Sequence, residues 1–156
     1  MHPNEELITR FYSAFRAGDH ATMEAGYTDD ATFSDPVFPT LSAEEVRAMW
    51  RMFCTGNNDI TVTFSDVQAD DRSGSARWEA VYKFPKTGRE VHNKISASFL
   101  FRDGKIVRHR DDFNFYAWTR MALGPVGTLL GWSPIVQGKV RQQAAAQLRR
   151  FKTPKE

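Results

Sequence analysis

Two side chains that can exchange protons stand two residues apart on the last predicted strand. His109 and Asp111 follow a hairpin turn at 103–104, and strand alternation points them to the same face. A carboxylate among apolar groups is disfavoured in its charged form, which suits it to acid–base chemistry. Alternation predicts that their face also carries Val107, Phe113 and Phe115, and that the opposite face carries Ile106, Arg108, Arg110, Asp112 and Asn114. We predict Asp111 as the principal acid or base and His109 as its partner; the alternative is a solvated pair at an edge.

Three more charged residues are candidates for the same chemistry. Asp35 precedes a proline, which biases it toward extended geometry, and we place it as a second carboxylate at the pocket mouth. Arg77 and Glu79 flank Trp78 on a strand predicted over 75–84. That strand's apolar face contains Trp78, which predicts that Arg77 and Glu79 lie on the solvated face. The alternative is that they turn inward toward Asp111.

Aromatic residues are abundant, with 12 Phe and 4 Trp in 156 residues. This content indicates a lined cavity or an oligomer interface, although a rich core also accounts for it. The predicted pocket walls and substrate contacts are Phe11, Tyr12, Phe15, Phe33, Trp50 and Phe113.

The predicted secondary structure that positions these residues changes from helices to strands near residue 60. Helical spacing predicts helices over 4–17 and 20–28, and a capping box at 42–45 opens a third that ends near 56–58. From residue 60 the period is two, and turns separate successive strands. Helices followed by an antiparallel meander predict an α+β fold, with a curved, antiparallel or mixed sheet over helices and a cone-shaped pocket between them.

The C-terminal part differs from the rest, so we divide the chain into a domain at 1–118 and a helical extension at 119–156. A helical turn is predicted over 117–123, a glycine- and proline-broken apolar stretch over 124–134, and a helix over 135–151. A basic amphipathic end after an apolar stretch could touch a membrane surface, but a lid over the pocket or a dimer arm is the preferred interpretation and membrane contact is not expected. The basic excess of the chain lies in this tail, at Lys139, Arg141, Arg149, Arg150, Lys152 and Lys155.

Composition excludes several other classes. The net charge is +2, from 21 basic and 19 acidic residues, which is not the basic excess typical of a nucleic-acid-binding protein. A single cysteine allows no internal disulfide, and four scattered histidines predict no metal site; no cofactor is expected. The polar N-terminus is unlike a signal peptide and no run is long enough to span a bilayer, so a cytoplasmic location is expected.

Several short motifs together resemble a known superfamily. They are Ala-Gly-Asp at 17–19, Asp-Asp-Ala-Thr-Phe at 29–33 with Asp-Pro at 35–36, and Asp-Gly-Lys-Ile-Val at 103–107 followed by Arg-His-Arg-Asp. Over about residues 4–118 the sequence resembles the nuclear transport factor 2-like superfamily, closest to its SnoaL-like branch. That branch contains ketosteroid isomerases, polyketide cyclases and limonene epoxide hydrolase. The resemblance implies a cone-shaped α+β barrel.

The resemblance also implies site residues. The ketosteroid isomerase base corresponds to Asp35, whereas its oxyanion tyrosine and aspartate fall on Phe11 and near Ala97, so the oxyanion hole is missing. The polyketide cyclase aspartate corresponds to Asp111, assisted by His109.

The epoxide hydrolase pattern gives a third correspondence. Its orienting arginine, its acid and its base resemble Arg77, Glu79 and Asp111. Its water-positioning tyrosine and asparagine fall on Phe33 and Asp35, which alters the water site.

We therefore predict a cofactor-free enzyme that uses a pocket carboxylate for proton transfer, as an isomerase or cyclase does, or for water addition to a small hydrophobic substrate. The alternative is a non-catalytic module of the same fold that binds an apolar ligand or serves as a dimeric scaffold. A homodimer is expected in either case.

Overall fold

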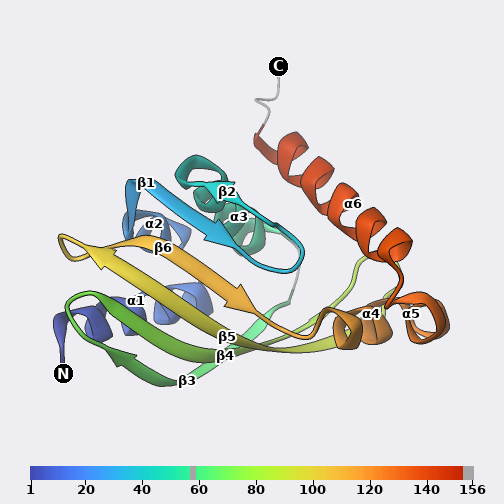
Figure 1. Cartoon of the computed structure of the whole chain (residues 1–156), viewed down its shortest axis with the longest axis horizontal. Coiled ribbons are helices and arrows are strands. Elements are labelled where there is room, and N and C mark those ends of the chain that lie inside the picture. The colour runs from blue at the N-terminus through green and yellow to red at the C-terminus, as the bar shows by residue number, and fades with distance from the viewer. Residues whose placement is uncertain (57–58, 153–156) are drawn as a thin grey trace.

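Six strands form one curved sheet, and the N-terminal helices pack against its inner face (Figure 1). The computed structural model describes residues 1–56 and 59–152. The helices are α1 (Pro3–Ala17), α2 (His20–Ala25), α3 (Ala43–Thr55), α4 (Phe115–Leu123), α5 (Pro125–Leu130) and α6 (Pro134–Lys152). The strands are β1 (Tyr27–Ser34), β2 (Leu41–Ser42), β3 (Thr61–Ala69), β4 (Ser73–Lys83), β5 (Glu90–Arg102) and β6 (Lys105–Asp112). The order is β2-β1-β6-β5-β4-β3, with β1 parallel to β6 and the other neighbours antiparallel. The predicted α+β fold, a mixed sheet over helices, is confirmed.

Local signals set the ends of the N-terminal helices. The Ser42 hydroxyl accepts a hydrogen bond from the backbone of Glu45, whose carboxylate accepts one from the backbone of Ser42, which is the predicted capping box. Gly18 ends α1 in the left-handed conformation, with φ of 72°, and Asp19 caps α2. The α3 helix ends at Thr55, and two of the three residues predicted at its end, 57–58, lie outside the described residues.

Predictions for the second helix and for the last strand are wrong in part, and Phe115, predicted on the strand face of His109, is instead the first residue of α4. The second helix does not reach residue 28, because it ends at Ala25 and Tyr27 begins β1; the carbonyl of Gly26 already accepts a hydrogen bond from the Ile106 backbone of β6 at 2.8 Å. Ile106 points inward and is fully buried, although alternation predicted it outward. The cause is a bulge: Arg108 pairs with Leu100 but Ile106 pairs with Phe101, so Val107 is the extra residue.

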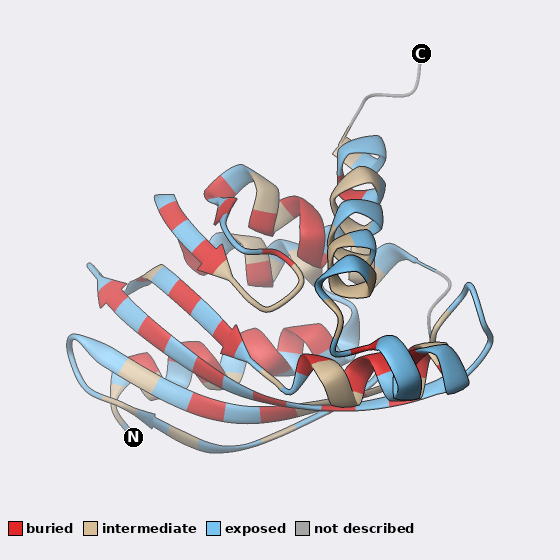
Figure 2. Ribbon diagram, turned by 45° about the vertical axis from the view of Figure 1, so that its right-hand side comes forward, coloured by how far each residue is buried: buried red, intermediate tan, exposed pale blue. Residues whose placement is uncertain are grey.

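The C-terminal helices attach to the domain by different contacts. Trp118 and Phe115 of α4 pack with Val91 of β5 in a small second apolar cluster. The α5 helix rests on α4, and α6 touches α3 and buries Leu148, while most of its remaining surface is exposed or half-buried (Figure 2). No helix within residues 1–56 and 59–152 is long and apolar enough to cross a membrane.

The packing of α5 on α4 gives a first prediction. A Cβ atom on Gly127 would overlap the carbonyl oxygen of Thr119, so Gly127→Ala must displace α5. We expect a loss of about 1–3 kcal/mol in the free energy of unfolding, measured by urea denaturation. Gly138→Ala in α6 is the matched control: its Cβ meets nothing within 4 Å, and alanine should raise helix stability by roughly 0.5–1 kcal/mol. A Gly127→Ala variant as stable as the parent would show that this contact is absent in solution.

Candidate active site

His109 and Asp111 form a hydrogen-bonded pair inside the fold. The Nε2 atom of His109 lies 2.8 Å from Oδ1 of Asp111, and the two side chains are 0% and 3% exposed. Both point to the inner face of β6, as the alternation predicted. In the sheet Asp111 stands beside Ala97, which in turn stands beside Ala76. The next two residues across the sheet from the carboxylate are therefore small and apolar.

The pair is part of a longer buried chain of hydrogen bonds. Tyr27 places its hydroxyl 2.8 Å from Nδ1 of His109, and Trp50 donates its indole N–H to the same hydroxyl at 2.9 Å. At the other end Trp78 donates to Oδ1 of Asp111 at 3.5 Å, the long limit for such a bond. Because an indole only donates, the simplest assignment has Tyr27 donating to Nδ1 and a neutral His109 donating from Nε2 to Asp111.

Aromatic rings surround the imidazole on several sides. Their centroids lie 4.4 to 6.3 Å from that of His109, and the rings belong to Phe11, Phe33, Trp50 and Phe99. Of the other predicted wall residues, Phe15 packs edge-on against Trp50, and Phe113 is half-buried beside the core. The structure thus brings these predicted residues together in one core, where they fill the space around His109. Their contact with a substrate stays a prediction.

Tyr12 is the one predicted wall residue with an unsatisfied polar atom. Its hydroxyl is buried and has no hydrogen-bond partner among the described residues. Burial, followed by the charge of Asp111, raises the pKa of Tyr12 well above its usual value, so the hydroxyl keeps its proton. A buried hydroxyl without a partner costs roughly 1–3 kcal/mol of stability. The hydroxyl of Tyr12 is thus a hydrogen-bond donor that no described residue uses.

Asp35 opens toward a small pocket that Asp111 also lines. The pocket has a volume of about 300 Å³ and lies between the Ser34–Pro39 segment and the end of β6. Backbone N–H groups of Val37 and Phe38 donate to Oδ1 of Asp35 at 2.8 and 2.6 Å. Desolvation is the largest influence and the charge of Asp111 adds to it, so the pKa of Asp35 rises to about 7. At neutral pH this carboxyl can both give and take a proton.

The raised pKa of Asp35 predicts a pH dependence of stability. Between the ordinary value of 3.8 and about 7 the folded state holds a proton that the unfolded state has lost, so stability falls as pH rises through this window. The contribution is complete below pH 3.8 and gone above about 7. We expect Asp35→Asn, which keeps the acceptor oxygen, to remove this slope. Urea denaturation of both proteins at several pH values from 4 to 8 measures how the free energy of unfolding depends on pH. The same pH dependence in both proteins would contradict the prediction.

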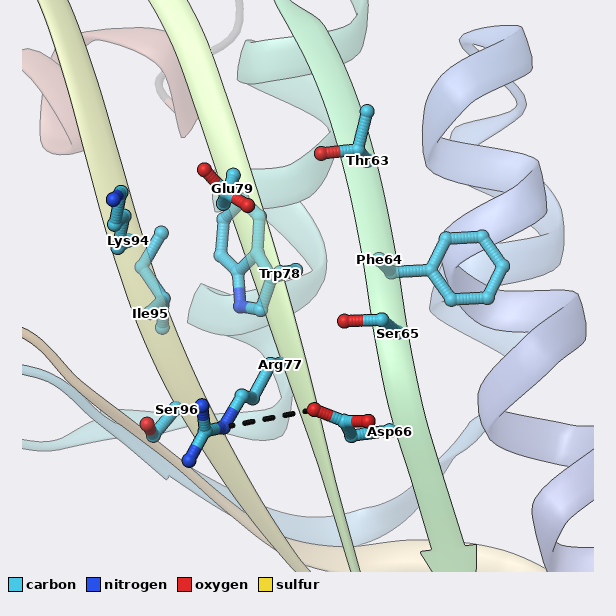
Figure 3. Close-up of a pocket in the computed structure, with 10 residues that line it drawn as sticks. All are labelled: Thr63, Phe64, Ser65, Asp66, Arg77, Trp78, Glu79, Lys94, Ile95 and Ser96. Carbon is cyan, nitrogen blue, oxygen red and sulfur yellow. Dashed lines mark ion pairs between the residues drawn. The ribbon is translucent and has the colours of Figure 1, made fainter.

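Arg77 and Glu79 lie on the other face of the sheet. Arg77 is 74% exposed and pairs with Asp66 at 3.8 Å, while Glu79 pairs with His92 at 2.6 Å. They line an open groove of about 640 Å³ on the outer face, shown in Figure 3, where Phe64 of the same groove turns toward the helices. The structure therefore does not bring Arg77 and Glu79 together with Asp111. The reason is the alternation of β4, in which Trp78 takes the inward position.

Two residues of the network were not among the predicted site residues. Tyr27 was assigned to a helix, although Tyr27, Ala31 and Phe33 recur at even spacing, a signal for a strand. Trp78 was recognised as apolar, but its contact with Asp111 joins residues on non-adjacent strands that only the folded sheet brings together. Within the described ranges, no three His, Cys, Asp or Glu side chains gather as metal ligands.

Comparison with known proteins agrees with this architecture. A model of the SnoaL-like domain family matches residues 8–109, about two thirds of the chain. The chain therefore belongs to the SnoaL-like family. A search of curated protein sequences finds no match.

Solved structures with the same fold include proteins of several activities. An LEH-like epoxide hydrolase from M. tuberculosis has a TM-score of 0.65 at 19% identity, over 84% of this chain and 97% of that one. IdmH, a candidate polyketide cyclase from Streptomyces antibioticus, has a TM-score of 0.62 at 22% identity, over 75% and 96%. A candidate ketosteroid isomerase from Kribbella flavida has 0.58 at 14% identity, over 72% and 78%. At these identities the likeness concerns the fold.

Proposed function

We propose that this protein is a cofactor-free enzyme that moves a proton on, or adds water to, a small hydrophobic substrate. The observation that carries the proposal is the position of Asp111. Its Oδ1 atom is held by His109 and Trp78 in an aromatic interior, yet the residue also lines a pocket with the second carboxyl, Asp35. A buried carboxylate beside a carboxyl of pKa about 7 is an arrangement suited to acid–base catalysis at neutral pH.

The two carboxyls would divide the work. In an isomerisation, Asp111 takes a proton from carbon next to a carbonyl and returns it to another carbon. In water addition, Asp111 takes a proton from water as its oxygen bonds to carbon, and Asp35 gives a proton to the oxygen that leaves that carbon. The unpartnered hydroxyl of Tyr12 would donate to a substrate oxygen in either reaction. Activities of both kinds are named among the structurally similar proteins.

The test is a panel of small hydrophobic epoxides and enolisable ketones, incubated with the protein in deuterated water and followed by NMR. Deuterium incorporation next to the carbonyl reports proton transfer, and diol formation reports water addition. We expect one of the two. A panel that stays unchanged while some members bind tightly would reject catalysis.

One observation favours a second function, a binding module or dimeric scaffold. The rings around His109 occupy the interior that an open substrate cavity would need. A homodimer is expected with either function, with the outer face of the sheet as the proposed contact, and light scattering in solution tests for it.

A further inference from the structure

Five large apolar side chains are exposed together where α5 meets α6. Val126, Leu129 and Leu130 are 55%, 71% and 49% exposed, and their i, i+3, i+4 spacing places them on one side of α5. Trp132 and Ile135 follow directly, at 67% and 72% exposure. We call these five residues the apolar tip. In Figure 2 the exposed colour covers much of α5. A cluster of this kind on a protein surface marks a site of interaction.

The fold holds the apolar tip outward. The opposite side of α5 carries Gly127, and Gly131 follows the helix as its C-cap. A Cβ atom on either glycine would overlap atoms of Thr119. The glycines therefore bring α5 against α4 so closely that no larger side chain could replace them there. The apolar residues of α5 have no inward position left, and their exposure is a property of the packing.

Positive charge surrounds the apolar tip. From residue 113 to residue 152 the sequence has no Asp or Glu. Arg120 is exposed at the end of α4, and Lys139 lies one helical turn after Ile135, on the same side of α6. The turn between β4 and β5 adds exposed Lys86 and Arg89, and it is fixed beside α4 by the hydrogen bond from Nε of Arg89 to the carbonyl of Met121, 3.0 Å long.

We propose that the apolar tip and its basic surroundings dock on an anionic lipid bilayer. Apolar side chains enter the interface between headgroups and acyl chains, and Lys and Arg side chains are attracted to anionic headgroups. A second copy of the chain fits less well, since a two-fold contact through the tip would bring two all-basic segments together. This inference reverses the expectation from sequence that membrane contact is absent, and it does not rest on the proposed enzymatic function.

The test uses the whole protein with vesicles of phosphatidylcholine, with and without phosphatidylglycerol. Trp132 is a built-in reporter, because Trp50, Trp78 and Trp118 are buried. We expect co-sedimentation and a blue shift of tryptophan emission with the anionic vesicles only, both weakened by added salt. Leu129→Ser combined with Ile135→Ser should lower the partition coefficient by roughly tenfold or more while Trp132 still reports.

Two further variants complete the experiment. Leu100→Ser is the matched control, because Leu100 is 42% exposed on β5, away from the tip, and binding should not change. Lys139→Gln with Lys86→Gln should weaken binding at low salt without altering the unfolding curve. Absent binding, equal binding to neutral vesicles, or loss of a dimer on substitution of the tip without any vesicle binding would each overturn the proposal.

Discussion

Asp111→Asn should lower kcat/KM by about 10²- to 10⁴-fold on whichever substrate the panel identifies, while the protein stays folded. The substituted amide keeps an oxygen that can accept the hydrogen bond from Nε2 of His109, but it cannot take a proton from substrate or water. The loss should fall on kcat more than on KM, because the proton moves in the transition state. Steady-state kinetics at several pH values measures both.

The pKa of Asp35 is an independent measure of whether the variant keeps the native site. The charge of Asp111 helps to raise the pKa of Asp35, so Asp111→Asn should lower the pKa of Asp35 from about 7 toward its ordinary value. Carbon-13 NMR of the carboxyl groups, assigned with Asp35→Asn, follows this shift. Asp103→Asn, in the β5–β6 turn, is the control and should change neither quantity. Full activity in Asp111→Asn, with the expected shift at Asp35, would remove Asp111 from the mechanism.

His109→Leu should reduce the free energy of unfolding by about 3–5 kcal/mol. Leucine fills much of the same space, but it leaves the buried carboxylate of Asp111 and the hydroxyl of Tyr27 without their imidazole partner. The cost comes mainly from the carboxylate, which loses the hydrogen bond from Nε2 of His109 while it stays buried in an apolar interior. Urea denaturation at neutral pH measures the loss.

Replacing both members of the pair separates charge from packing. His109→Leu/Asp111→Leu removes the buried charge together with its partner, so the double variant should recover much of the stability that the single variant loses. The control is His92→Leu, which breaks the exposed pair with Glu79 and should cost less than about 1 kcal/mol. A loss at His109 no larger than that at His92 would show that the network does not stabilise the fold.

Local sequence determined much of the fold. The capping box at Ser42, the helix end at Gly18 and the hairpin turn at 103–104 each act over a few residues, so their geometry is readable without the rest of the chain. Strand alternation likewise placed His109 and Asp111 on one inner face, because side chains on a strand have a period of two.

Tertiary structure decided the environment of that pair. The bulge at Val107 reversed the expected direction of Ile106, and such a bulge arises from pairing with neighbouring strands, where the registers to both β5 and β1 shift at this point. Tyr27 and Trp78 reach the pair from β1 and β4, at sequence separations of 82 and 33 residues, and no local pattern encodes such contacts. Local sequence did not predict the placement of α5 either, because the close contact of Gly127 with Thr119 turns the apolar residues of α5 outward. The sequence determined which groups could do chemistry and on which face they lie; only packing decided which partners they meet and which apolar surface stays exposed, because those depend on contacts between distant segments.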